Sequence, residues 1–571
     1  MLDVVIKGGE VVDGTGAARR RADVGIQGDR VVALGTVEGE AATTIDATGK
    51  VITPGFVDVH THYDAQVFWD DAMTPSPLHG VTSAFAGNCG FTIAPLSDDP
   101  SDGEYLMRML SRVEGMTLES LRTGVPWNWK STGEYLDTLE GHVGINIGFS
   151  VGHSAIRRVV MGSEATVREA KPEELDAMRA LLRDGLEAGG LGFTSSYART
   201  HNDPDGNMVP SRYASIEELV ELARVTGEFE GTALELIPMV GPFEPWAVQL
   251  MTAMSAAAQR PINWNVMAVN AANLADCELK LEAGSYGAQQ GARIVALTIP
   301  MSFPLRLSFR AGFVLDAMPT WESVMLLPLE EKLAVFRDPD QRRALNEAAQ
   351  SDTNPMKGLA QWARMRIFDV FAAENEQYRG KTVGEIAEAE GRDPWDVLTS
   401  IALADDLNTG FGTTPVPESA DDWKARVQVW RDRRALIGAS DAGAHLDMFS
   451  TANYATKLLG AVRDHSLMPL EEAVSLITQV PAELYGLRER GVVREGWKAD
   501  LAVFDPATVD SEPVAMRYDL PGGAGRLFAD SIGVSDVLVN GTSIVRDGEL
   551  TAHRPGTVLR SGRDTTNGAM Q

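Results

Sequence analysis

The sequence predicts an α/β protein whose centre consists of parallel βα units and whose two ends form antiparallel β-structure. In the centre, from about residue 53 onward, short apolar segments alternate with segments of helical periodicity, which is typical of parallel strands connected by helices. At both ends, short apolar runs are separated by glycine-containing turns, which is typical of small antiparallel strands. The length of 571 residues is too great for one ordinary domain and leaves room for insertions.

The two chain ends are each too poor in strands to form a stable sheet alone. Their apolar runs cover residues 4–6, 11–12, 23–26 and 31–34 at the N-terminus, and residues 499–504, 537–541 and 543–548 at the C-terminus. We therefore expect the N-terminal and C-terminal strands to pair with each other.

Eight apolar segments in the central region predict the parallel strands. They are residues 56–59, 80–86, 145–153, 191–196, 233–237, 261–266, 292–299 and 435–438. A helix is expected to begin at Pro172 and to end at Gly189, because proline favours the first helical turn and glycine the C-terminal cap. The next helix is expected to begin with a capping box formed by Ser215 and Glu218.

Two long segments interrupt this alternation. The first follows the second strand, from about residue 96 to 142, and contains Trp127 and Trp129. It forms either a helical cover with its own small core or a lid over a substrate pocket, since loops after such strands often carry function. The second lies between the seventh and eighth strands, at about residues 300–430, and is mostly helical in pattern.

Composition excludes several classes of partner. The formal net charge of −29 argues against nucleic acid and against an anionic membrane. No apolar run is long enough to cross a bilayer, and the N-terminus does not have the pattern of a signal peptide. The two cysteines, Cys89 and Cys277, form no disulfide framework. We expect a cytoplasmic protein.

Two histidines end the first central strand. His60 and His62 are separated by one residue, and alternate residues of a strand point to the same side. Both imidazoles are therefore expected to converge on one metal ion, for which neutral imidazole is a common ligand. The alternative is that both histidines bind backbone groups at the end of the strand.

The string Pro-Gly-Phe-Val-Asp-Val-His-Thr-His at residues 54–62 resembles the first barrel strand of the amidohydrolase superfamily. The rest of the chain is similar to one branch of it, the N-acyl-D-amino-acid deacylases, over nearly the whole length. The strings at residues 87–90, 152–157, 491–500 and 519–524 carry this likeness.

The resemblance implies a (β/α)8 TIM barrel with a small β-sandwich domain formed from both chain termini. Residues 1–52 and 488–560 would form the sandwich, and residues 53–487 the barrel with the two insertions. The polar segment 561–571 is expected to be a flexible tail.

Asp441 is the candidate catalytic residue. Amide hydrolysis at neutral pH is aided by a metal, which lowers the pKa of bound water from 15.7 to about 7, and by a carboxylate that accepts and returns a proton. Asp441 follows the eighth strand, and the resemblance implies that it binds metal and transfers the proton. The alternative is that Asp441 caps the next helix.

Cys89 and Glu235 are further candidate metal ligands. The resemblance implies that Cys89 binds metal, and a thiolate is a good zinc ligand; the alternative is a small buried cysteine. The branch normally has metal-binding histidines on the fifth and sixth strands, but no histidine lies between residues 202 and 444. Glu235, Asn263 and Asn265 occupy those strands instead, and the fourth strand has no lysine to bridge two ions.

Three interpretations of this departure stay open. Glu235 replaces one of the missing ligands; the site holds a single ion bound by His60, His62, Cys89 and Asp441; or the metal site is degenerate.

Five residues near the third and fourth strands are candidate substrate-binding groups. The resemblance singles out His153 and Arg157, and an arginine is well suited to hold a substrate carboxylate. A structural arginine paired with an acidic neighbour is the alternative. Tyr197, Arg199 and His201 follow the fourth strand and are expected to face the same pocket.

The resulting functional hypothesis is a metal-dependent amidohydrolase that cleaves the linear amide of an N-acyl amino acid or a related N-acyl compound. The D configuration of that substrate rests on the resemblance alone. The implied cofactor is Zn2+ or another divalent metal, as one or two ions, the partner is a small-molecule substrate, and a homo-oligomer stays open. The alternatives are hydrolysis of another C–N bond, as in a cyclic amide, formamide or urea-like compound, and a non-catalytic binding protein on a degenerate barrel.

Overall fold

The computed structural model describes residues 1–239, 241–310, 313–354, 356–413 and 417–570. Its centre is a set of parallel strands alternating with helices, and each of the eight predicted segments contains a strand. In order they are β8 (Phe56–Asp58), β9 (Val81–Ala86), β10 (Asn146–Phe149) with β11 (Val151–Gly152), β12 (Gly192–Ser196), β13 (Ala233–Ile237), β14 (Ile262–Met267), β15 (Ile294–Thr298) and β19 (Ala435–Ile437).

Neighbouring strands of this set pair in parallel from β8 to β10 and from β11 to β19. The third strand is divided at Ser150, and its first half also pairs with β28 (Val558–Leu559) from the C-terminus. At the carboxyl ends of the first and last strands, the Asp441 N–H donates to the His60 carbonyl at 3.1 Å and the His62 N–H donates to the Ala442 carbonyl at 2.7 Å. These hydrogen bonds bring the first and last strands together beside the predicted catalytic residues.

Helices cover the parallel strands on the outside. They are α5 (His153–Met161), α6 (Pro172–Glu187), α7 (Ile216–Thr226), α8 (Pro245–Ala258), α9 (Leu274–Gln289), α15 (Ala420–Trp430), α16 (Tyr454–His465), α17 (Leu470–Leu476) and α18 (Gln479–Leu484). Helix α6 begins at Pro172 as predicted and buries Met178, Leu182 and Leu186 along one stripe. The predicted capping box of α7 is only half formed, because Ser215 caps the helix but the Glu218 side chain turns into the core.

The two chain ends share one sheet. Strand β7 (Val51–Pro54) pairs antiparallel with β20 (Leu501–Phe504), and the sheet order is β27-β26-β25-β20-β7-β2-β3. Its other strands are β2 (Glu10–Val11), β3 (Arg20–Arg21), β25 (Val534–Val539), β26 (Thr542–Arg546) and β27 (Glu549–Leu550).

A second sheet, entirely N-terminal, has the order β5-β4-β1-β6. Its strands are β1 (Leu2–Lys7), β4 (Asp23–Gln27), β5 (Arg30–Gly35) and β6 (Ala41–Asp46). Apolar side chains of both sheets, such as Ile6, Ile26, Ile52 and Leu538, belong to one buried cluster.

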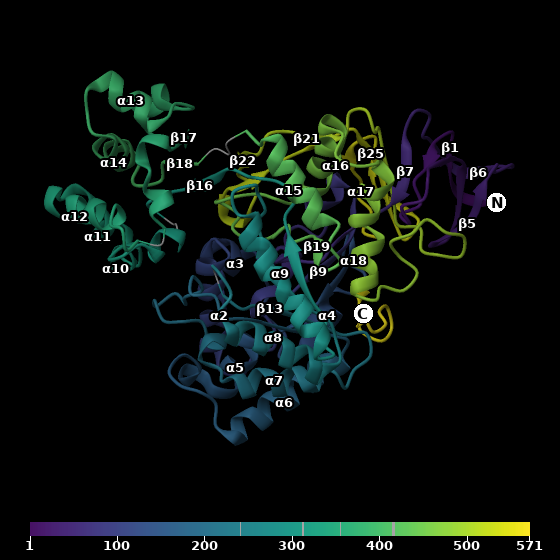
Figure 1. Cartoon of the computed structure of the whole chain (residues 1–571), viewed down its shortest axis with the longest axis horizontal. Helices are drawn as coiled ribbons and strands as arrows, with labels where there is room; N and C mark the ends of the chain where they lie inside the picture. Colours follow the sequence, from purple (N-terminus) through teal and green to yellow (C-terminus); the bar gives the residue numbers. More distant parts are fainter. Residues whose placement is uncertain (240, 311–312, 355, 414–416, 571) are drawn as a thin grey trace.

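The first insertion contains α2 (Pro100–Val113), α3 (Leu118–Gly124) and α4 (Thr132–Leu139), which pack against the barrel strands. The second forms a separate lobe, which Figure 1 shows at the upper left. This lobe contains β16 (Leu305–Leu307), β17 (Arg366–Asp369), β18 (Gly410–Thr413) and the helices α10 (Glu322–Met325), α11 (Leu329–Arg337), α12 (Pro339–Ala349), α13 (Val383–Glu390) and α14 (Pro394–Ala404). It has its own aromatic core, including Phe309, Trp321, Phe336 and Trp395.

The C-terminal segment that we predicted to be flexible instead forms hydrogen bonds with the rest of the chain as far as Ala569. Thr565 is fully buried, and its hydroxyl donates to the Gly231 carbonyl at 2.7 Å. The Gly231 N–H in turn donates to Asn567 at 2.8 Å. Polar composition suggested fraying, but backbone groups of barrel loops pair with these polar side chains. No helix among the described residues combines the length and apolar character needed to span a membrane.

Candidate metal centre and active site

His60 and His62 lie at the carboxyl end of β8, where their rings face each other. Both are buried, and their Nε2 atoms are 3.3 Å apart. Cys89 follows β9 in a tight turn, and its Sγ lies 3.6 Å from His60 Nε2 and 3.8 Å from His62 Nε2. Within the described parts of the chain, these three residues form the group whose potential ligand atoms all lie within 4.8 Å of one another.

The turn around Cys89 is fixed by close backbone packing. Cys89 has a φ of +58°, and Gly87 and Gly90 flank the turn. A Cβ on Gly87 would lie 2.6 Å from the Ser150 carbonyl oxygen, so only glycine fits there. The Asn88 amide donates to the carbonyls of Thr61 and Phe85 at 3.0 and 3.1 Å, which joins the turn to the first two strands.

The spacing of the three donor atoms agrees with zinc coordination. Zinc–nitrogen bonds of about 2.0–2.1 Å and zinc–sulfur bonds of about 2.3 Å in a tetrahedron place two nitrogens about 3.3 Å apart and a nitrogen and sulfur about 3.6 Å apart. The observed separations of 3.3, 3.6 and 3.8 Å follow this pattern. His60, His62 and Cys89 therefore fit three corners of a tetrahedral ion.

Asp441 lies against the histidine pair. Its Oδ1 is 3.0 Å from His60 Nε2 and 3.4 Å from His62 Nε2, and the side chain keeps 24% of its surface exposed to the cavity. Burial opposes ionisation of this carboxyl, but the two imidazoles outweigh it and hold the pKa of Asp441 well below its usual value. The side chain therefore stands ionised beside the donor group.

Glu235, on β13, hydrogen-bonds to the backbone of Cys89 and lies outside the close group of donor atoms. Its Oε2 accepts the Cys89 backbone N–H at 2.8 Å, and its Oε1 accepts from the Asn265 amide. Burial raises the pKa of Glu235 to about 7. Asn263 faces away from the site, toward the Tyr485 hydroxyl and the Leu234 carbonyl.

Glu114 is a site residue that the sequence did not reveal. It comes from the first insertion, is buried, and places Oε1 3.3 Å from His62 Nδ1. Burial disfavours a protonated His62, but Glu114 together with Asp441 and Asp64 outweighs burial and raises the pKa of His62 to about 9. Such a carboxylate–histidine contact orients a metal-binding ring. The only sequence signal for Glu114 was its place in a candidate lid.

A cavity of about 490 Å³ is lined by His60, His62, Cys89, Glu114 and Asp441. Its wall is mainly apolar, and Val113 and Glu114 of the first insertion contribute to it, so this insertion both has a buried core and borders the cavity. The other lining side chains include Ile237, Phe243, Trp264, Ile299, Phe303 and Phe449, with His201, Asn273 and Lys280 among the polar ones.

Four of the five candidate substrate-binding residues lie elsewhere. Only His201 lines the cavity, where its Nδ1 is 2.7 Å from the Ser196 hydroxyl. His153 Nε2 and Arg157 Nη1 both contact Glu218, at 2.8 and 2.5 Å, in a fully buried network. The Tyr197 hydroxyl donates to the Ala214 carbonyl, and Arg199 is exposed. Lys280 and Asn273, which sequence analysis missed, line the cavity from α9 and the residue that precedes it.

The buried network makes Arg157 a structural residue with a large predicted effect on stability. Arg157→Met is expected to lower the free energy of unfolding by about 3–5 kcal/mol, because it leaves the Glu218 carboxylate without its cation. In the native protein, burial lowers the pKa of His153, so Arg157 is the cation that balances Glu218 in this network. Chemical denaturation measures the effect, with exposed Arg224→Met on α7 as the control. A loss below about 1 kcal/mol would contradict this role.

Comparisons with known proteins agree with this arrangement. A model of the amidohydrolase family matches residues 43–545. The chain is 28% identical to the N-acyl-D-glutamate deacylase of Alcaligenes xylosoxydans xylosoxydans, over 98% of this chain and 96% of that protein. It is 26% identical to the D-aminoacylase of the same organism, over 98% and 97%.

A solved structure of the Bordetella bronchiseptica N-acyl-D-glutamate deacylase, complexed with zinc and a phosphonate inhibitor, superposes with a TM-score of 0.67 at 25% identity. The match covers 98% of this chain and 100% of that one. The agreement along the whole length supports an α/β barrel.

Proposed function

Because this chain belongs to the amidohydrolase family, we propose that it is a metal-dependent hydrolase that removes the acyl group from an N-acyl-D-amino acid. The observation that carries the proposal is the His60–His62–Cys89 donor group, with Asp441 beside it at the edge of a cavity. The names of the relatives, a D-aminoacylase and an N-acyl-D-glutamate deacylase, support the substrate class. They do not favour a cyclic amide substrate or a non-catalytic barrel.

His60, His62 and Cys89 would hold a Zn2+ or similar divalent ion. When bound, the ion supplies Lewis acidity that activates water and polarises the amide carbonyl. Asp441 accepts the proton of the attacking water and returns it to the leaving nitrogen. Its Oδ1 faces the histidines and its Oδ2 lies 4.0 Å from His445 Nε2, and we assign the proton transfer to Oδ2.

We favour one ion over two. Glu235 uses both carboxylate oxygens in hydrogen bonds, to the Cys89 backbone and to Asn265, and it lies outside the close donor group. This supports the interpretation in which His60, His62, Cys89 and Asp441 surround a single ion. A solved D-aminoacylase structure is described by one-metal activation and second-metal attenuation, which is compatible with a single essential ion.

The cavity wall selects the substrate. Lys280 carries the only lysine or arginine charge among the described lining residues and would face the α-carboxylate, a role for which sequence analysis considered Arg157. The apolar wall would hold the acyl chain. Lys280 also lines a neighbouring cavity, where its ammonium pairs with Asp276 at 3.0 Å, so a substrate carboxylate would compete with this ion pair.

We also propose the domain architecture of the chain, its cellular compartment and the class of its partner. The hydrogen bonds between the ends of β8 and β19 support a closed eight-stranded barrel at about residues 53–487. The shared cluster supports a sandwich of residues 1–52 and 488–560. Both cysteines are free, which suits the cytoplasm. The acidic charge favours a small-molecule substrate over nucleic acid.

Metal removal and a substrate panel test this function together. The purified protein is expected to contain about one zinc-like ion per chain by mass spectrometry of metals. It should hydrolyse N-acetyl-D-amino acids faster than their L enantiomers and faster than neutral amides. A chelator should abolish turnover, and added zinc, manganese or cobalt should restore it. Absence of turnover on the whole panel with each of these metals would overturn the proposal.

A further inference from the structure

A second cavity, of about 380 Å³, lies beside the metal cavity. His445 and Met448 line both cavities and thus form the wall between them. The wall is reinforced where the His445 N–H donates to the Glu114 carbonyl and where Gly115 packs against the backbone of His445. The second cavity is therefore a separate space on the other side of His445.

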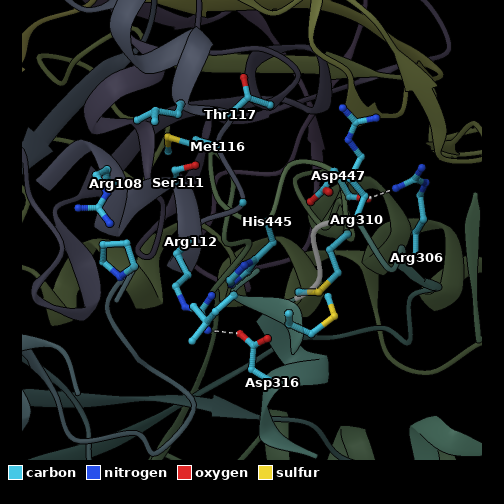
Figure 2. A pocket seen from close by; sticks show the side chains of 16 residues that line it. Arg108, Ser111, Arg112, Met116, Thr117, Arg306, Arg310, Asp316, His445 and Asp447 are labelled. Carbon is cyan, nitrogen blue, oxygen red and sulfur yellow. Dashed lines mark hydrogen bonds and ion pairs between the residues drawn. The ribbon is translucent and has the colours of Figure 1, made fainter. Parts of the chain in front are cut away.

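Four arginines surround this cavity (Figure 2). Arg108 and Arg112 come from α2 of the first insertion, and Arg306 and Arg310 come from β16 and the chain that follows it in the second. Figure 2 shows the first pair on the left of His445 and the second pair on its right. The chain has 80 acidic and 51 basic residues, so four guanidinium groups around one cavity depart from its overall acidic composition.

Three of the four arginines pair with aspartates, and the acidic residues that line the cavity itself are Asp316 and Asp447. Arg112 pairs with Asp316, and the Arg306 Nη1 donates to the Asp447 carbonyl at 3.1 Å. The partners of Arg108 and of the Arg306 Nε, Asp205 and Asp369, lie outside the lining.

Arg310 is exposed and makes no side-chain hydrogen bond or ion pair with any residue that the structure describes. Each guanidinium carries five N–H donors in a planar fork. Arg310 therefore offers unpaired donors, and Arg108, Arg112 and Arg306 keep N–H groups beyond those that their aspartate partners accept.

The cavity has a buried inner part and an exposed rim. The side chains of Arg306 and Arg112 are 8% and 14% exposed, whereas that of Arg108 is 39% exposed. Charge-assisted hydrogen bonds strengthen where water is excluded, so an anion in the inner part would be bound more strongly than on an open surface. The hydroxyls of Ser111 and Thr117 add neutral donors to the same wall.

We propose that this arginine cavity is a binding site for a small, multiply charged anion, a phosphate-bearing compound or a polycarboxylate, separate from the substrate cavity. Planar guanidinium groups bind both kinds of anion through paired N–H donors. A bound anion would contact both insertions at once and would lie directly behind His445, which faces Asp441. The inference does not depend on the proposed reaction.

Calorimetric titration with inorganic phosphate and with citrate tests the site. Both the zinc-loaded protein and a His60→Ala variant are used, because phosphate also binds metal ions. Binding is expected in both proteins and should weaken as ionic strength rises. Tighter binding of phosphate would indicate a phosphate-bearing ligand, and tighter binding of citrate a polycarboxylate.

Substitution of the exposed arginines at the rim tests where the anion binds without removing a buried side chain. The double variant Arg108→Gln/Arg310→Gln is expected to weaken binding by at least about 10-fold, as expected from the loss of two charge-assisted contacts. Arg343→Gln on α12, an exposed arginine that pairs with Asp340, is the matched control and should leave affinity unchanged. Absence of binding to the wild type, binding that disappears in His60→Ala, or equal affinity in the double variant would each overturn the proposal.

Discussion

Asp441→Asn is expected to lower kcat for an N-acetyl-D-amino acid by about 10²–10⁴-fold, the usual contribution of general acid–base catalysis. Asparagine keeps the size of the side chain and an oxygen near the imidazoles, but it does not accept the proton of the attacking water. The Asp441 Oδ1 atom lies 3.0 and 3.4 Å from the two Nε2 atoms. The substitution should impair proton transfer but leave His60, His62 and Cys89 in place to bind the metal. The expected variant is therefore metal-containing and nearly inactive.

Steady-state kinetics and metal analysis of the same preparation measure this result. Asp464→Asn, at an exposed position in the last turn of α16, is the matched control and should retain wild-type rates. If the Asp441 variant turns over within about threefold of the wild type while it keeps its metal, another group carries the proton. Loss of the metal from this variant would instead show that Asp441 acts mainly as a ligand.

The central strands could be predicted because their signals are local. The segments at β13 and β15 are short, mainly apolar runs that follow a glycine-containing turn, and the structure has strands there. The division of the third strand at Ser150 was not predictable in this way, because it arises where β28 from the distant C-terminus pairs with β10. The bound C-terminal segment has the same kind of cause, since its partners Gly231 and Gly486 lie in distant loops.

The donor residues could be singled out because they stand at strand ends in specific strings, as His60, His62 and Cys89 do. Glu114 could not, because its importance comes only from the folding of an insertion against His62. Arg157 contacts an acidic neighbour, which was the alternative that the sequence left open, and the sequence could not decide between the two for a related reason. The local pattern gave Glu218 to a helix cap, whereas the fold uses that carboxylate for His153 and Arg157.

Cys89→Ala is the decisive substitution for the single-ion centre, and Cys277, the other buried cysteine, supplies its matched control. Cys277 lies on α9 near the Ala268 carbonyl, away from the histidines, so Cys277→Ala should leave metal affinity unchanged. Alanine at residue 89 keeps a Cβ, so the backbone, with its φ of +58°, experiences no new restriction. Any difference between the two variants thus reports on the thiolate.

The Cys89→Ala protein is expected to bind zinc more than about 100-fold more weakly, beyond the 10–100-fold cost of losing an outer partner of a ligand. Its turnover should fall below detection at stoichiometric zinc. Competition with a chromophoric chelator measures the affinity, and the sulfur-to-metal charge-transfer band of the cobalt-loaded protein should disappear. If the alanine variant holds zinc with native affinity, the ion must lie between the histidines and the carboxylates of Asp441 and Glu235. In that case Glu235 would be a metal ligand, rather than only the acceptor of the Cys89 backbone N–H.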